Sequence, residues 1–215
     1  MNEIGANRYG KQKVRLVKVV RGPKEHLVRD LTVGIKLEGD FAEAHTTGSN
    51  ALVVTTDTMK NTAYALAPEH LGGSIEAYGT ALARHFLRDG QVSRASVSIA
   101  EHRWVRLDGA AGPAPDAFRR SGDFTRTAAV SATRDATTVE AGIEDLSVMK
   151  TSRSAFRGFP RDEYTTLREV DDRILATKVT ATWRYGDGAA LEARFHAARE
   201  ARNRWLAGDF DASTD

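Results

Sequence analysis

The sequence contains no cysteine, which excludes disulfide bonds, thiolate metal ligands and a cysteine nucleophile. It has no apolar run of the length that crosses a membrane, and its first residues, MNEIGANRYGKQK, lack the apolar core of a secretory signal. The charge is nearly balanced, because 31 basic and 29 acidic side chains give a formal net charge of +2. So small a bias gives no electrostatic footprint for nucleic acid. We therefore expect no membrane partner and no nucleic-acid partner.

Several catalytic and cofactor motifs are also missing. There is no GxGxxG or GxxxxGK[ST] phosphate cradle and no GxSxG nucleophile elbow. The six histidines form no HxH or HExxH pair, so the sequence predicts no metal site. What remains is an ordinary globular composition, 41% hydrophobic, long enough at 215 residues for one domain or two small ones.

The first half of the chain has the hydrophobic pattern of strands followed by helices. Residues 12–21 and 26–37 predict two strands joined at the turn sequence GPKE, and in the second the apolar side chains from Leu27 to Leu37 mostly alternate with polar ones. A short apolar run at 50–55 leads to a helix that Asp57 could cap. Ser74 precedes a second helix with a stripe of apolar residues extending to Phe86.

The pattern of strands then starts again after a predicted loop. Residues 91–107 alternate as one strand, and 108–122, rich in Gly, Ala, Pro and Asp, predict a linker or long loop. Strands are expected at 124–133, 142–151 and 178–185, and a helix at 189–206. The sequence thus predicts an α+β fold with antiparallel strands and helices on one face, in two units at residues 8–122 and 123–215. On this pattern the second unit stops after its first long helix and is incomplete.

Three segments resemble the urate oxidase (uricase) family in content and order. They are YGK at Tyr9–Lys11, TTDTMKNTAYALA at Thr55–Ala67 and LSVMKTSRSAFRGFPRDEYTTLREVDDR at Leu146–Arg173. The third is the most specific, because many positions agree over its whole length. GDFAEAHTTGSN (Gly39–Asn50), ARHFL (Ala83–Leu87) and DRILATKVTATWRY (Asp172–Tyr185) add support.

The resemblance implies a fold, an assembly and a reaction. The family has tandem T-fold (tunnelling-fold) units, and four chains form a barrel-like homotetramer with active sites between subunits. It oxidises urate with O2 and water to 5-hydroxyisourate and hydrogen peroxide, without metal or organic cofactor. A role in purine catabolism implies a cytoplasmic location, or a peroxisomal one in a eukaryote, although the final residues STD are not an SKL-type signal.

The resemblance also assigns roles to six residues. Lys11 and Thr56 correspond to a proton-relay pair, and Asp57 orients the purine with its backbone and side chain. From a neighbouring chain, Arg173 grips the carbonyl oxygens of urate, Phe156 stacks on its ring and Leu167 forms a wall of the pocket.

Without the resemblance, the same residues have ordinary structural interpretations. Lys11 would face solvent, and Thr56 and Asp57 would end a strand and cap a helix. Arg173 would pair with Glu169 or Asp172, and Phe156 would belong to the core.

The sequence departs from the family in two places. The family's substrate-clamping glutamine and its NxH motif have no counterpart before Asp215, so we expect a C-terminally truncated chain. A His-Ala-Phe-like element of the family reads Asp116-Ala117-Phe118 here. The alternative hypothesis is therefore a catalytically impaired remnant that binds purine or only assembles. A pterin-type T-fold enzyme with zinc would need a histidine cluster, which the sequence lacks.

Overall fold

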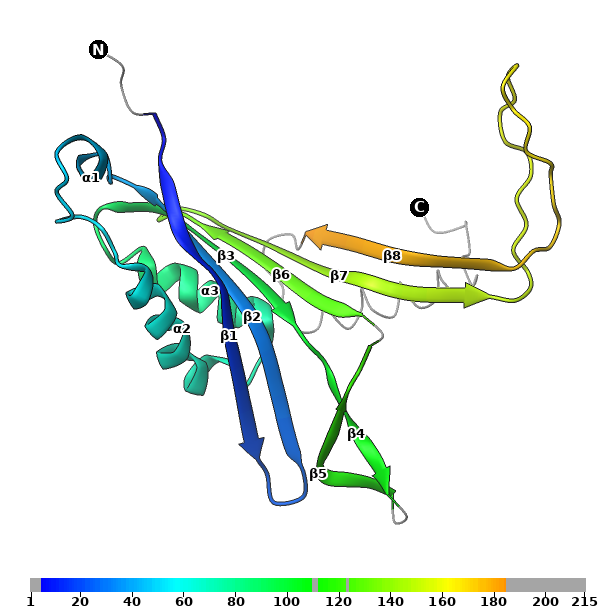
Figure 1. The fold of residues 1–215 in the computed structure, drawn as a ribbon, viewed down its shortest axis with the longest axis horizontal. Helices are drawn as coiled ribbons and strands as arrows, with labels where there is room; N and C mark the ends of the chain where they lie inside the picture. The colour runs from blue at the N-terminus through cyan, green and yellow to red at the C-terminus, as the bar shows by residue number, and fades with distance from the viewer. Residues whose placement is uncertain (1–4, 110–111, 123, 185–215) are drawn as a thin grey trace.

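The structure, a computed structural model, describes residues 5–109, 112–122 and 124–184 (Figure 1). Within these residues the chain forms eight strands and three helices. The strands are β1 (Arg8–Arg21), β2 (His26–Gly39), β3 (Val92–Glu101), β4 (Trp104–Gly109), β5 (Gly112–Arg120), β6 (Thr125–Ala132), β7 (Thr137–Lys150) and β8 (Leu175–Arg184). The helices are α1 (Glu43–Thr46), α2 (Thr56–His70) and α3 (Ile75–Phe86).

Six strands form one antiparallel sheet in the order β1-β2-β3-β6-β7-β8. The predicted hairpin of β1 and β2 is confirmed: Arg21 pairs with His26, and the Gly22 N–H donates to the Glu25 carbonyl at 3.1 Å. Every pair in the sheet is antiparallel, and sequential strands are neighbours except where the β4–β5 ribbon interrupts the order. The predicted α+β class is therefore confirmed.

Two strands of the sheet contain β-bulges of the same kind. The register of β1 shifts between residues 11 and 14, and Lys13 has φ 59°. The register of β7 shifts between residues 143 and 146, and Asp145 has φ 60°. In each bulge a residue other than glycine adopts the left-handed conformation, which is uncommon and costs energy.

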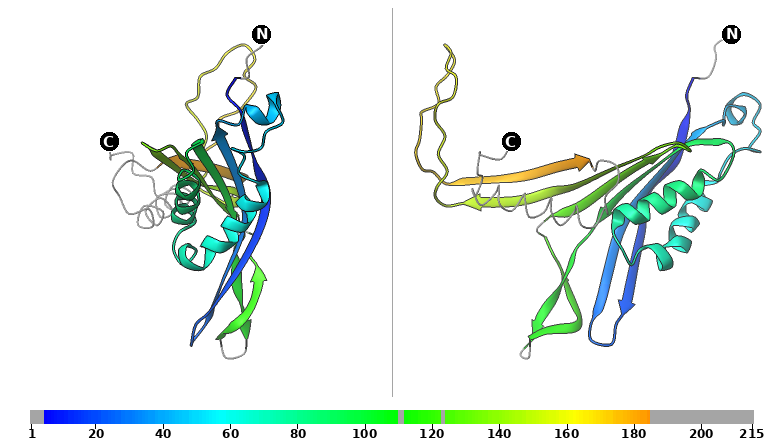
Figure 2. Two further views of the ribbon diagram at one scale, coloured as in Figure 1. Left: turned by 90° about the vertical axis from the view of Figure 1, so that its left-hand side faces the viewer. Right: turned by 180° about the vertical axis from the view of Figure 1, so that it is seen from behind.

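Both long helices pack on the same face of the sheet (Figure 2). Ser74 caps α3 by accepting the Ala77 N–H at 3.1 Å, as the sequence predicts. The apolar stripe of α3 is buried to 1% exposure or less, and the Tyr78 hydroxyl donates to the Ala63 carbonyl of α2. Burial raises the pKa of Tyr78. The core therefore lies between this helix layer and strands β1, β2, β3 and β6.

The region 91–122 differs from the sequence-based prediction. The single strand expected at 91–107 is two strands, because β3 ends at Glu101 and β4 belongs to a separate sheet. The linker expected at 108–122 includes β5, which pairs with β4 in a two-stranded ribbon. Its prolines are tolerated because an isolated ribbon leaves one edge of each strand without a pairing partner. The ribbon projects beyond the end of the sheet (Figure 1).

A chain of buried charges joins α3 to three strands. Arg126 donates to both carboxylate oxygens of Glu76, at 2.9 and 2.6 Å, and lies 3.5 Å from Glu101. Arg29 completes the chain at 2.5 Å from Glu101, and also donates to the Gly73 carbonyl at 2.7 Å. Glu76 is fully buried, and this pairing gives its side chain hydrogen-bond partners in place of water.

A second polar cluster connects the ribbon to the sheet around Asp30, which is 2% exposed. Its carboxylate accepts hydrogen bonds from Arg15 and, at 3.0 Å, from the Trp104 indole. The Thr32 hydroxyl accepts from Arg15 at 2.9 Å and lies 2.8 Å from the His102 Nε2 atom. Which of these two groups donates depends on the tautomer of His102.

The strands expected in the second half are confirmed with shifted ends. The strand expected at 124–133 is β6, the strand expected at 142–151 is β7, which begins earlier, and the strand expected at 178–185 is β8. The helix predicted at 189–206 lies outside the described residues. The division at 122/123 remains a prediction, although one sheet continues from β3 to β6 across it. No helix in the described ranges is long and apolar enough to cross a membrane.

Candidate active site

The six predicted site residues form two groups. Lys11, Thr56 and Asp57 lie where β1 runs beside the start of α2. Phe156, Leu167 and Arg173 lie on residues 151–174, an arm between β7 and β8. Figure 1 shows this arm standing away from the far end of β7 and β8, on the opposite side of the molecule from α1 and α2. One chain therefore keeps the two groups apart.

The bulge in β1 determines which face of the sheet carries Lys11. Lys11 pairs with Ile35, and Val14 pairs with Val33. Ile35 and Val33 are fully buried on the helix-covered face, and paired residues of an antiparallel ladder point to the same face. Positions three apart in a regular strand point to opposite faces. The extra residue of the bulge thus returns Lys11 to the face on which α2 begins.

The two residues before Lys11 fix this part of β1 in place. The Tyr9 hydroxyl donates to the Val54 carbonyl at 2.7 Å, and its ring packs edge-on against Phe41 with centroids 4.8 Å apart. Burial raises the pKa of Tyr9, partly offset by this hydrogen bond. At Gly10 a Cβ atom would lie 2.0 Å from the Ile35 carbonyl oxygen, so only glycine fits. The YGK motif therefore holds its lysine close to the segment that leads into α2.

The start of α2 differs from the prediction that Asp57 caps the helix. Thr55 is the capping residue, because its hydroxyl accepts the Thr58 N–H at 3.0 Å. Asp57 lies inside the first turn, and its carboxylate contacts two side chains further along the helix. Oδ1 lies 2.5 Å from the Lys60 ammonium, and Oδ2 accepts from the Asn61 amide at 2.8 Å.

The charge of Asp57 is stabilised by its neighbours. The hydrogen bond and positive charge of Lys60 lower the pKa of Asp57 below its ordinary value, and smaller contributions come from Asn61 and Lys11. The contribution of Lys11 is consistent with the closeness of β1 to the start of α2. Sequence reasoning missed Lys60 and Asn61, although their spacing of three and four residues from Asp57 could have identified them.

The first turn of α2 also presents backbone donors. The Thr58 N–H bonds to the capping residue, and the Met59 N–H bonds to the Thr55 carbonyl at 3.1 Å. Among the described residues, the N–H groups of Thr56 and Asp57 have no acceptor. Helix N-termini with such free donors attract anions.

The second group is organised around an aromatic ring. Phe156 pairs with Val170 in an isolated β-bridge, which closes the arm. The Arg173 guanidinium lies over the Phe156 ring at 5.3 Å from its centroid, and Phe159 stacks on Phe156 at 5.0 Å. Phe156 is 42% exposed and Leu167 is 48% exposed, so the interpretation of Phe156 as a core residue is wrong. An aromatic ring and a guanidinium are thus presented together to solvent.

The acidic residues beside Arg173 support the backbone of the arm. Asp172 accepts the Ser154 N–H at 3.3 Å, and Glu169 accepts the Gly158 N–H at 3.2 Å. Neither forms the ion pair with Arg173 that the local sequence suggests, among the residues that the structure describes. The guanidinium therefore keeps its donors available for a ligand.

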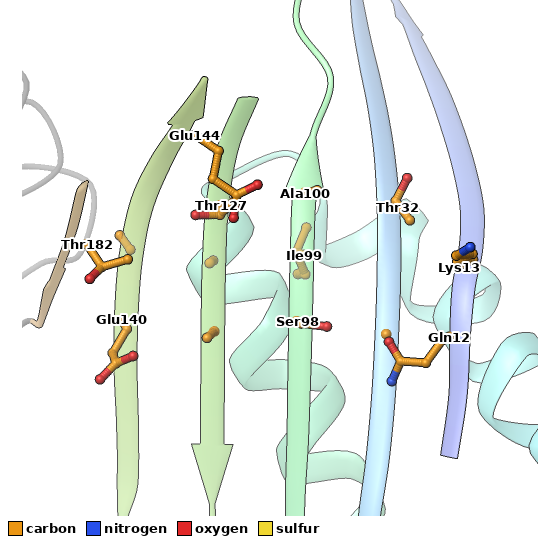
Figure 3. Close-up of a pocket in the computed structure, with 14 residues that line it drawn as sticks. Gln12, Lys13, Thr32, Ser98, Ile99, Ala100, Thr127, Glu140, Glu144 and Thr182 are labelled. Carbon is orange, nitrogen blue, oxygen red and sulfur yellow. The ribbon is translucent and has the colours of Figure 1, made fainter. Parts of the chain in front are cut away.

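A depression of about 340 Å³ lies on the sheet face opposite the helices (Figure 3) and contains none of the six residues. Its polar lining includes Gln12, Lys13, Thr32, Ser98, Thr127, Glu140, Glu144 and Thr182. In the described ranges no group of three or more His, Asp or Glu side chains could hold a metal ion.

Comparison with known proteins identifies the family of this chain. A family model described as Uricase matches residues 7–131 and 139–214. The uricase of Arthrobacter globiformis is 44% identical over 183 residues, which are 85% of this chain and 59% of that protein. The uricase of Dictyostelium discoideum is 42% identical over 83% of this chain and 64% of its own length. The chain thus spans about three fifths of the length of these relatives.

Solved structures of uricases have the same fold. The crystal structure of the Arthrobacter globiformis uricase superimposes with a TM-score of 0.82 at 40% identity, covering 99% of this chain and 71% of that one. The urate oxidase of Bacillus sp. TB-90 gives a TM-score of 0.73 at 25% identity, over 84% of this chain and 68% of that one. Sequence and structure therefore agree that this chain belongs to the uricase family.

Proposed function

We propose that this chain is a urate oxidase of purine catabolism, which converts urate, O2 and water into 5-hydroxyisourate and hydrogen peroxide. The atoms balance as follows: both oxygens of O2 leave in the peroxide, so the hydroxyl oxygen of the product comes from water. Urate loses two electrons, and O2 accepts them. The observation that supports this function best is the presence, at the family's positions, of a lysine-threonine pair beside free helix donors and an arginine over an exposed aromatic ring.

The protein groups bind, orient and move protons in this proposal, and the electron-rich urate reduces O2 directly. Lys11 and Thr56 transfer a proton between urate and water, since a hydroxyl can both donate and accept. Arg173 donates two parallel hydrogen bonds to the urate carbonyl oxygens. Phe156 stacks on the purine ring, and Leu167 covers one side of it.

The separation of the two groups supports a site that is shared between two chains. Lys11 is exposed in the single chain, and a lysine acts as a base near neutral pH only when it is desolvated or lies near other cations. We propose that the arm of a neighbouring chain brings Phe156, Leu167 and Arg173 to Lys11, in a homotetramer with sites between subunits. A cytoplasmic location is proposed on the family resemblance.

The decisive experiment follows the ultraviolet absorbance of urate after the purified chain is added, with peroxide measured in parallel. Loss of absorbance with equimolar peroxide, abolished by Arg173→Ala, is the expected result. No loss with folded protein would contradict the proposal and favour a remnant that binds purine without turnover. Equilibrium dialysis with labelled urate would then measure that binding.

A further inference from the structure

The carboxylate of Asp57 lies next to the donors that an anionic ligand needs. The free N–H groups of Thr56 and Asp57 are at the positive end of the α2 dipole. Carboxylates in the first turn of a helix are stabilised by these same groups. An unrestrained Asp57 side chain would therefore compete with a bound anion for its donors and repel it as a like charge.

The structure shows how the side chain is restrained. Both carboxylate oxygens are engaged, one by Lys60 at 2.5 Å and the other by Asn61 at 2.8 Å. Lys60 and Asn61 lie three and four residues further along the same face of the helix, so their bonds occupy the carboxylate oxygens that would otherwise accept from the first N–H groups. The ammonium also balances the negative charge.

The geometry points to Lys60 and Asn61 as positioning residues that hold the Asp57 carboxylate neutralised along α2, so that the N–H groups of Thr56 and Asp57 remain free for an anionic purine. This inference rests on the proposed function, because it assumes that urate binds at the start of α2. It gives Asp57 a narrower role than the family resemblance implies: its backbone orients the substrate, and its side chain is kept away from the substrate.

A double-mutant cycle tests the inference through the urate dissociation constant, measured without O2 so that no turnover occurs. Lys60→Met is expected to weaken urate binding about fivefold, the upper range for an exposed pair, and Asn61→Ala less. Lys60→Arg restores the pair and binds like the wild type. In an Asp57→Asn background, Lys60→Met has no further effect, because no carboxylate remains to be neutralised.

Lys24→Met in the β1–β2 turn is the matched control, since it removes one positive charge far from α2. An equal loss of affinity from Lys60→Met in both backgrounds would overturn the inference, because it would show that Lys60 attracts urate directly. No loss in the wild-type background would overturn it as well.

A second measurement separates this inference from the proposed function. Carbon-13 titration of the free protein gives the pKa of Asp57, which should rise towards its ordinary value in Lys60→Met and stay low in Lys60→Arg. An unchanged pKa in Lys60→Met would refute the positioning role. If the wild type neither binds nor oxidises urate, the proposed function fails, and this titration still decides whether Lys60 restrains the carboxylate.

Discussion

Lys11 lies directly opposite Ile35 in the β1–β2 ladder, although Lys11 is exposed and Ile35 is completely buried. At this pair, the face of the hairpin that is buried under the helices elsewhere begins to carry a residue of the candidate active site. Further along β1, the same face carries the buried residues Val14 and Leu16. The face of β1 that carries apolar side chains at Val14 and Leu16 thus carries an amine at Lys11, because the bulge places Lys11 on that face.

Replacing Lys13 by glycine should stabilise the fold. The left-handed φ of 59° costs a lysine energy that glycine does not incur. Glycine also makes the unfolded chain more flexible, but the strain energy that is relieved exceeds this entropic cost. Urea denaturation should show an increase of about 0.5 to 1 kcal/mol in the free energy of unfolding. Val19→Gly, in the regular part of β1, should lower it by about 1 kcal/mol. A loss of stability in Lys13→Gly would contradict the strained bulge.

Removing Glu76 should destabilise the fold strongly. Glu76→Ala leaves Arg126 without its bidentate carboxylate in the interior, and breaking a buried pair costs about 3 to 5 kcal/mol. Glu140→Ala is the control, because Glu140 pairs with Arg184 in an exposed position and should cost less than about 1 kcal/mol. Equal losses in the free energy of unfolding for Glu76→Ala and Glu140→Ala would show that the buried ion pairs contribute no more to stability than an exposed one.

The polar cluster around Asp30 should make stability depend on pH through His102. Burial, followed by the positive charges of Arg120 and Arg15, lowers the pKa of His102 below its ordinary value of 6.5, against the opposing effect of Asp30. As pH falls through 6.5 the unfolded chain gains a proton before the folded chain does, so the free energy of unfolding decreases. This contribution is complete above 6.5 and is lost as pH falls through the lower, folded-state pKa.

Urea denaturation between about pH 5 and pH 8 would measure this dependence in the wild type and in His102→Gln. The variant keeps a polar side chain that can hydrogen-bond to Thr32 but does not titrate, so its stability should decrease less towards acid pH. Identical pH profiles would show that His102 titrates in the folded state as it does in the unfolded chain.

The exposed arm should contribute to catalysis and little to folding. Arg173→Ala and Phe156→Ala remove exposed side chains, so each should change the free energy of unfolding by less than about 0.5 kcal/mol. Urate turnover should fall by about 100-fold or more in Arg173→Ala, because the donors to the urate oxygens are lost. Arg157→Ala, which removes an exposed ion pair with Asp171 on the same arm, should leave turnover nearly unchanged. A large loss of stability in Arg173→Ala would contradict the prediction that the arm contributes little to folding.

The regular elements of the fold were predictable because burial follows the period of each element. Alternation in β2 places Leu31, Val33, Ile35 and Leu37 in the core, and all four are fully buried. The same alternation includes Leu27, which is 46% exposed because the helices do not cover the hairpin end. Strand β5 was missed because its prolines and glycine are typical of loops, whereas an isolated ribbon can accommodate them.

The candidate site was predictable only in part. The identity of its residues came from resemblance to a family, since a lone Lys11 or Arg173 has no distinctive spacing. The bulge had no glycine to indicate it, because Lys13 itself adopts the left-handed conformation. The contact between Asp57 and Lys60 could have been inferred from helical spacing. That the Asp57 carboxylate bonds to Lys60 rather than to the free N–H groups of the helix depends on side-chain geometry.

The second bulge bears on binding stoichiometry. In β7 the residue that precedes the bulge is Ile143, which pairs with Ala181 and is completely buried, whereas the corresponding residue of β1 is Lys11. Strands β1 and β7 therefore contain the same kind of bulge, but only β1 carries an amine at the residue that precedes it. A calorimetric titration of the assembled protein should accordingly saturate at one urate per chain rather than two.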